Sequence, residues 1–201
     1  GNAARLASES NADIVTHRAF QIWWTPDSHV EDPADDEEAD RHSSARSGRM
    51  PWHGSSFRPS MRSRMRGWWM RKFAHRMFPT PIPSDRLEDG GHLQLGDRRI
   101  SASHTPGHTA DHVCWHDADG GVLFSGDHVL PTITPHIAGI GAGPDPLADY
   151  VASLSKTAAL ADVQLVLPAH GHPMQDLQSR TASIIEHHEE RLDDLRGIIA
   201  A

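Results

Sequence analysis

The sequence predicts a mixed α/β (α+β) fold, and three features of its apolar pattern support this class. Short apolar runs alternate with Gly and Asp turn residues between residues 90 and 126, which is typical of consecutive strands. Apolar side chains recur at spacings of three and four over residues 145–161, which indicates an amphipathic helix. Residues 163–168 (VQLVLP) then form an apolar run of strand length. We treat residues 1–201 as one domain, because a chain of this length can bury a single core.

The chain begins with a predicted helix and a short strand. Residues 1–10 (GNAARLASES) are rich in Ala and Leu, which favour helix. Residues 12–17 (ADIVTH) are typical of a strand, and residues 18–24 (RAFQIWW) predict a helical turn after it.

A segment of different character follows, over residues 28–80. Residues 31–40 (EDPADDEEAD) are acidic and lack apolar anchors, and residues 61–78 interleave Arg and Lys with Met, Trp and Phe. The second stretch predicts a basic amphipathic helix that ends at a Pro-rich stretch. We interpret residues 28–80 as an inserted lid or flexible segment; the alternative is that the basic helix binds RNA or an anionic lipid surface.

The elements that follow are predicted from turn residues and hydrophobic periodicity. We expect strands at 92–95, 98–103, 112–116, 121–125 and 163–168, and helices at 145–161 and 175–199.

Composition narrows the classes of function. The net charge of -8 argues against a protein that coats nucleic acid with a uniformly basic surface. A single cysteine, Cys114, excludes an internal disulfide framework and a multi-cysteine metal site, so any metal must be held by nitrogen and oxygen. No apolar run is long enough for a transmembrane helix, and no basic-then-apolar leader follows Gly1. We therefore expect a cytoplasmic protein.

Three segments each place a metal-ligand side chain among small turn residues beside an apolar strand. They are TPGHT with His108, FSGDH with Asp127 and LPAHGH with His170. Strands that end at one edge of a sheet would bring the three side chains together, as a metal site requires. Two imidazoles and a carboxylate suit zinc, and iron or manganese also accepts such ligands.

In this order and spacing, the three segments resemble the second half of the metallo-beta-lactamase superfamily, over residues 85–195. The stretches FSGDHVLPTITPHI, LVLPAHGHPM and HHEERLDDL are most similar to the glyoxalase II-like bacterial hydrolases of that superfamily. The resemblance implies part of an αβ/βα sandwich. It also implies that His108 binds the first metal, that Asp127 bridges both metals, and that His170 binds the second.

One departure from the family pattern concerns its first motif, His-x-His-x-Asp-His, which is absent from this sequence. In the family this motif stands between a strand and a helix that begins much like residues 1–10. We therefore expect an N-terminally truncated domain that binds metal weakly and is inactive alone.

The resemblance implies hydrolysis by a metal-bound hydroxide, with two zinc ions acting on an ester or thioester of a small-molecule substrate. Asp127 is the predicted catalytic residue because it holds both ions. One alternative is a phosphodiesterase or nuclease of the same fold. A second alternative is a non-catalytic half-domain that binds a partner or nucleic acid. Oligomeric state is not predicted.

The other histidines near these segments receive different interpretations. We expect hydrogen bonding to a ligand or simple turn packing at His104, His112 and His172. Surface positions or the mouth of the site are expected for His128 and His136, and a solvated helix face for His187 and His188. Cys114 is predicted to be a small buried strand residue.

Overall fold

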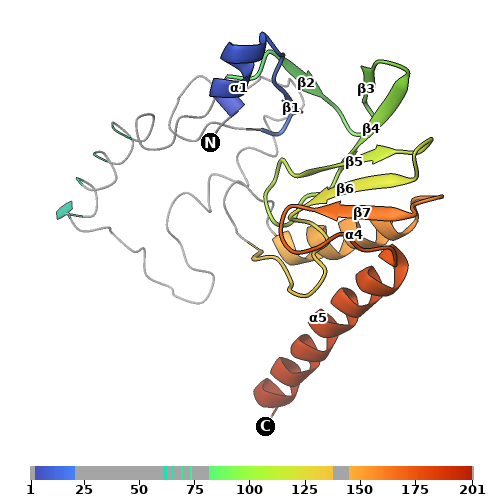
Figure 1. Ribbon diagram of the computed structural model, residues 1–201. Helices are drawn as coiled ribbons and strands as arrows, with labels where there is room; N and C mark the ends of the chain where they lie inside the picture. Colours follow the sequence, from blue (N-terminus) through green and yellow to red (C-terminus); the bar gives the residue numbers. More distant parts are fainter. Residues whose placement is uncertain are drawn as a thin grey trace. The chain divides into compact units, whose positions relative to one another are not determined.

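The computed structural model describes residues 3–20, 61, 62, 65, 69, 73, 82–137 and 145–200 (Figure 1). The chain divides into two compact units. Residues 1–16 and 21–85 form the first, and residues 17–20 and 86–201 form the second.

In the first unit, helix α1 (Ala3–Ser10) confirms the predicted N-terminal helix. An ion pair between Arg5 Nε and Glu9 Oε1, 2.7 Å apart, joins successive turns of α1. Asn11, with a φ of 52°, follows the last helical residue and turns the chain out of the helix.

Strand β1 (Val15–His17) pairs with β2 (Asp85–Leu87) in a two-stranded sheet. Strand β1 was predicted and β2 was not. The described residues of the predicted basic helix are helical: they are residues 61, 62, 65, 69 and 73. The remainder of the predicted 28–80 insertion lies outside the described residues, so its role as a lid stays a prediction.

The second unit contains a five-stranded sheet in the order β3-β4-β5-β6-β7. Its first three pairings are antiparallel and the last, β6 with β7, is parallel. The observed bounds lie within two residues of the predicted strands: β3 (His92–Leu95), β4 (Arg98–His104), β5 (Val113–Asp117), β6 (Val122–Gly126) and β7 (Leu165–Pro168).

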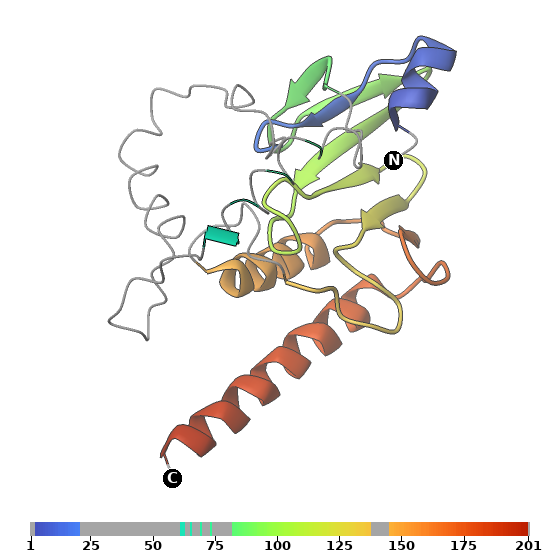
Figure 2. The same cartoon turned by 90° about the vertical axis from the view of Figure 1, so that its left-hand side faces the viewer.

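Two helices accompany this sheet, α4 (Pro146–Ala158) and α5 (Leu177–Ala200). Helix α4 lies in the connection between β6 and β7, as parallel neighbours require a crossover segment. Asp145 caps its N-terminus, because the Asp145 carboxylate accepts the Ala148 N–H at 3.0 Å, and Pro146 occupies the first turn. Figure 2 shows α4 and α5 on one side of the sheet.

The core of the second unit lies between this face of the sheet and the two helices. Leu123 of β6 and Val166 of β7 are paired in register and fully buried. Leu154 of α4 and Ile184 of α5 belong to the same apolar cluster, as does Cys114, which confirms its predicted burial. The opposite sheet face is less well covered, since Phe124 is 43% exposed.

One predicted element was wrong in its described part. Arg18 and Ala19 form a turn closed by a bond from the Phe20 N–H to the His17 carbonyl, and Phe20 has no regular structure. Residues 21–24 lie outside the described part. Within the described ranges, no helix combines the length and the apolar character needed to span a membrane.

Candidate metal-binding site

The three predicted ligands lie at one edge of the five-stranded sheet. Asp127 directly follows β6 and His170 follows β7, and the two strands are parallel neighbours. His108 comes from the loop that joins β4 to β5. The structure brings all three together: Asp127 Oδ2 lies 3.8 Å from His108 Nε2, and Asp127 Oδ1 lies 3.4 Å from His170 Nε2.

The Asp127 carboxylate therefore directs one oxygen to each imidazole. Its Oδ1 atom is buried and makes no hydrogen bond within the described residues. A buried carboxylate oxygen that accepts no hydrogen bond is costly unless a cation compensates it. The carboxylate is thus placed where a positive charge would stabilise it.

The His108 ring is held in place by a hydrogen bond at Nδ1, the ring nitrogen farther from Asp127. Nδ1 donates to the His136 carbonyl oxygen at 2.7 Å, which leaves the lone pair on Nε2, the nitrogen nearest Asp127. The loop can approach α4 because residue 107 is Gly: its φ is +140°, and a Cβ there would lie 2.5 Å from the Tyr150 Cβ. His136 is exposed, in line with the sequence prediction.

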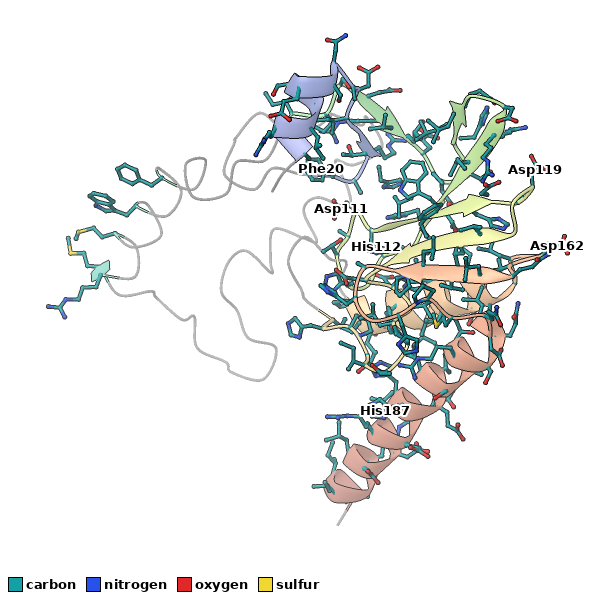
Figure 3. The ribbon with its side chains drawn as sticks, viewed as in Figure 1. Phe20, Asp111, His112, Asp119, Asp162 and His187 are labelled. Atoms are coloured by element: carbon teal, nitrogen blue, oxygen red, sulfur yellow. The ribbon has the colours of Figure 1, made fainter. Side chains whose placement is uncertain are left out.

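His112 contacts the backbone of Asp127. Its Nε2 accepts the Asp127 N–H at 3.2 Å, and its Nδ1 lies 2.8 Å from the Thr105 hydroxyl. Burial, and then the neighbouring His108, lowers the pKa of His112 to about 4. Figure 3 shows His112 at the sheet edge where β6 and β7 end, and Asp119 and Asp162 at the opposite edge.

The sequence predicted contact with a ligand for His112 only as one of two options. Thr105, which holds the His112 ring, was missed. Its signal was the position directly before the Pro-Gly turn in HTPGHT, where a hydroxyl can reach across the loop.

The predicted surface position of His128 is wrong. The side chain is fully buried, with its ring centroid 5.8 Å from that of His112 and 5.3 Å from that of Tyr150. Burial is the main cause that lowers the pKa of His128 to about 3. The ring is therefore a neutral packing element.

The two helical histidines differ from each other. His187 is exposed, as predicted for a solvated face. His188 is partly buried, with its ring 5.8 Å from Tyr150, and burial lowers its pKa. The solvated position predicted for His188 is wrong because Tyr150 of α4 reaches it.

The last two histidines near the predicted ligands, His104 and His172, differ in their burial. His104 packs its ring against His17, and its Nε2 lies 2.7 Å from the Ala110 carbonyl oxygen, so it has a packing role. His172 is exposed.

The side chains of His108, Asp127 and His170 are of the types that bind metal, but three such ligands are too few for a complete metal site. Two imidazole nitrogens and a carboxylate are ligands that zinc, iron and manganese accept. These three residues would supply two imidazoles and one carboxylate to any metal held here. Among the residues described here, no group of three or more His, Cys, Asp or Glu side chains has the geometry to hold one ion. A complete site needs further ligands.

A shallow pocket of about 390 Å³ lies beside the loop that follows Asp127. Arg180 of α5 supports this loop by donating to the Leu130 carbonyl at 2.7 Å and to the Ile133 carbonyl at 2.9 Å. The pocket is lined by Thr132, Ile133, Thr134, Arg180, Ser183, Ile184 and His187.

Comparisons of this chain with known proteins all point to one protein family. The family model of the metallo-beta-lactamase superfamily matches residues 1–195. Acyl-coenzyme A thioesterase MBLAC2 from Gallus gallus is 36% identical over 112 residues, which are 52% of this chain and 36% of the relative. Lactamase-like protein nscB from Neosartorya fischeri is 34% identical over 113 residues, 56% of this chain and 32% of the relative. The chain thus spans about a third of the length of these curated relatives.

Solved structures show the same fold. The metallo-beta-lactamase family protein TTHA1429 from Thermus thermophilus is 22% identical, with a TM-score of 0.66 over 100% of this chain and 60% of that chain. A beta-lactamase domain protein from Burkholderia ambifaria is 31% identical, with a TM-score of 0.56 over 69% of this chain and 47% of that chain. The protein TTHA1623, solved in a di-iron-bound form, is 22% identical, with a TM-score of 0.53 over 90% of this chain and 69% of that chain.

Proposed function

Because the chain belongs to the metallo-beta-lactamase superfamily, we propose that it supplies His108, Asp127 and His170 to a two-metal hydrolase site. The proposed reaction is hydrolysis of a thioester or ester bond in a small-molecule substrate. In this proposal the second unit forms one half of an αβ/βα sandwich.

The observation that carries the proposal is the position of the Asp127 carboxylate. Its two oxygens are directed to different imidazoles, at 3.8 Å from His108 Nε2 and 3.4 Å from His170 Nε2, and Oδ1 is buried without a hydrogen bond. A carboxylate placed between two imidazoles in this way could hold metal together with each of them.

Each residue has a defined task in the proposal. His108 presents Nε2 as a ligand because its Nδ1 proton is donated to the His136 carbonyl. Asp127 would hold metal through its carboxylate, and His170 would supply the second imidazole. Two bound zinc ions would supply a hydroxide nucleophile near neutral pH and stabilise an oxyanion; iron or manganese could replace them.

A thioester is the favoured substrate class because curated relatives of this chain bear the name acyl-coenzyme A thioesterase. Cleavage of phosphodiesters uses the same kind of two-metal site, so it serves as the comparison reaction in the test.

Metal binding by the 201-residue chain is the first test, measured by zinc titration calorimetry at pH 7.5. We expect weak binding, since the described part of the site is short of ligands, and at least a tenfold loss of affinity in Asp127→Asn. Asp119→Asn is the matched control, because Asp119 is exposed at the opposite sheet edge. Equal zinc affinities of the two variants would contradict the proposal.

The reaction is tested by thiol release from an acyl-coenzyme A, against bis(4-nitrophenyl) phosphate, with the chain and with the full product of its gene. We expect the gene product to cleave the thioester and Asp127→Asn to abolish cleavage. Turnover of the phosphodiester alone would reassign the substrate class.

A further inference from the structure

We propose that His112 is a positioning residue that orients Asp127 by accepting its backbone N–H; the proposal rests on the metal site proposed above. His112 itself is not a ligand in this proposal. It acts on the direction in which the Asp127 side chain leaves the end of β6.

The first support is the hydrogen bond itself. Asp127 N lies 3.2 Å from His112 Nε2, and the two residues are fifteen positions apart in the chain. A backbone N–H normally finds a carbonyl partner at the end of a strand, so a side-chain acceptor here replaces the sheet ladder where β6 ends. The β6–β7 register also shifts between Phe124 and Gly126, so the backbone at this point is irregular.

The second support is the tautomer that the surroundings impose. Because the Asp127 N–H donates, Nε2 must carry the lone pair, and Nδ1 must carry the proton, which it donates to the Thr105 hydroxyl 2.8 Å away. Thr105 is fully buried, and its own N–H donates to the His112 carbonyl at 2.9 Å. Thr105 therefore holds both the ring and the backbone of His112.

The third support is the space left for the ring. Gly126 has a φ of +54°, and a Cβ at this position would lie 2.7 Å from His112 Nε2. An L side chain would thus meet the ring and would also strain the backbone. Gly126 lets the imidazole approach the peptide that leads into Asp127.

These contacts explain how one carboxylate can serve two imidazoles. The peptide between Gly126 and Asp127 leads directly into the Asp127 Cα–Cβ bond, and from this position Oδ1 lies 3.4 Å from His170 Nε2 and Oδ2 lies 3.8 Å from His108 Nε2. Loss of the acceptor on His112 would free this peptide to rotate, and groups that orient a ligand typically change metal affinity by about 10- to 100-fold.

The test compares two amides at position 112. In His112→Gln the side-chain carbonyl reaches the place of Nε2 and can accept the Asp127 N–H. In His112→Asn the shorter amide keeps a donor for Thr105 but leaves Asp127 N without its partner. The readouts are Co²⁺ affinity and the visible absorption of bound Co²⁺, with circular dichroism and thermal unfolding as controls for folding.

We expect His112→Asn to lose about tenfold or more in Co²⁺ affinity and to change the Co²⁺ spectrum. We expect His112→Gln to stay within a few-fold of the parent chain, with both variants folded. Equal affinities and spectra for the two variants would overturn the positioning role.

A second measurement is independent of metal. In ¹⁵N-labelled apoprotein, the hydrogen bond predicts a scalar coupling between the Asp127 amide nitrogen and His112 Nε2, and its absence overturns the proposal. A parent chain that shows this coupling and binds no Co²⁺ would overturn the metal site while leaving the hydrogen bond established. The two failures are therefore distinguishable.

Discussion

At the scale of single residues, the histidines of this chain owe their chemistry to their surroundings. The His17 ring stacks on His104 with 3.8 Å between ring centroids and 12° between planes, and His17 is only 7% exposed. Burial, and then the neighbouring His104, lowers the pKa of His17 to about 4. Burial beside His104 therefore favours the neutral form of His17.

This shift predicts how stability depends on pH. The pKa of His17 is about 4 in the folded chain and near its ordinary 6.5 when unfolded, so the unfolded state binds the proton first. Stability is therefore complete above about pH 6.5 and falls toward pH 4, by up to about 1.4 kcal/mol per pH unit from this group. His17→Phe keeps the stacked ring and removes the proton site, so its unfolding free energy should fall less steeply.

Urea unfolding at pH 7, 6 and 5 measures the two slopes. His112 and His128 also have lowered pKa values, so some slope remains in the variant. Parallel curves for the parent chain and His17→Phe would contradict the expectation.

At the scale of secondary structure, β6 separates a buried face from a partly exposed one within two adjacent residues. Leu123 is fully buried against the helices, whereas Phe124 on the other face is 43% exposed. The sheet face that carries Phe124 is therefore covered less completely than the face that carries Leu123.

Replacing these neighbours should therefore have unequal effects. Leu123→Ala should lower the unfolding free energy by about 2–5 kcal/mol, since it leaves a cavity in the core. Phe124→Thr should cost less than half as much, because much of the ring already contacts solvent and Thr favours a strand. Chemical denaturation of both variants gives the comparison, and equal losses would refute the assignment of faces.

Helix α4 offers a separate test at its N-terminus. Asp145→Ala removes the acceptor of the Ala148 N–H and should cost about 1 kcal/mol, whereas Asp145→Asn keeps a capping oxygen and should cost less. Thermal unfolding of both variants measures the difference. Equal losses in the two variants would show that the negative charge of Asp145 matters here more than the hydrogen bond, since both variants remove the charge and only Ala removes the acceptor.

The sequence predicted the elements between residues 92 and 199 because their signals are local: turn glycines, alternation and helical spacing. Strand β2 was missed because its three residues, Asp85–Leu87, have no apolar pattern, and its partner β1 lies some 70 positions earlier. The burial of His128 was missed for a similar reason, since Tyr150, 22 residues later, covers the ring and donates to the His128 carbonyl.

At the candidate site, His108, Asp127 and His170 could be selected because each stands among small residues beside an apolar strand. The bond between His112 and the Asp127 N–H could not be predicted, because it depends on a glycine conformation at residue 126 and on the pairing of β5 with β6. A hydrogen bond of this kind depends on how the strands pair in three dimensions, which the order of residues in the sequence does not reveal.

At the scale of the whole second unit, packing is concentrated where the strands meet the beginning of α5. The buried residues of α5 are Leu177, Thr181 and Ile184, all in its first third. Leu195 and Ile199, nearer its end, are 55% and 84% exposed. One continuous helix thus has two different environments.

Amide hydrogen exchange should record this gradient. We expect amides of β5, β6 and residues 177–185 to exchange slowly and those of residues 190–200 to exchange at least a hundredfold faster, because few tertiary contacts oppose their opening. Exchange of the intact chain, followed by peptic digestion and mass spectrometry, measures both regions. Equal protection along α5 would mean that another surface covers its second half.

The single cysteine gives this chain a built-in reporter of its own opening. Cys114 has no exposed surface, its Sγ lies 3.5 Å from the Thr105 hydroxyl, and burial raises its pKa to about 12. A thiol in that state does not react with a disulfide reagent until the strands around it separate. The sequence contains no second thiol. The rate of labelling by such a reagent therefore measures one event, the opening of the sheet at Cys114, next to Thr105, which hydrogen-bonds to His112.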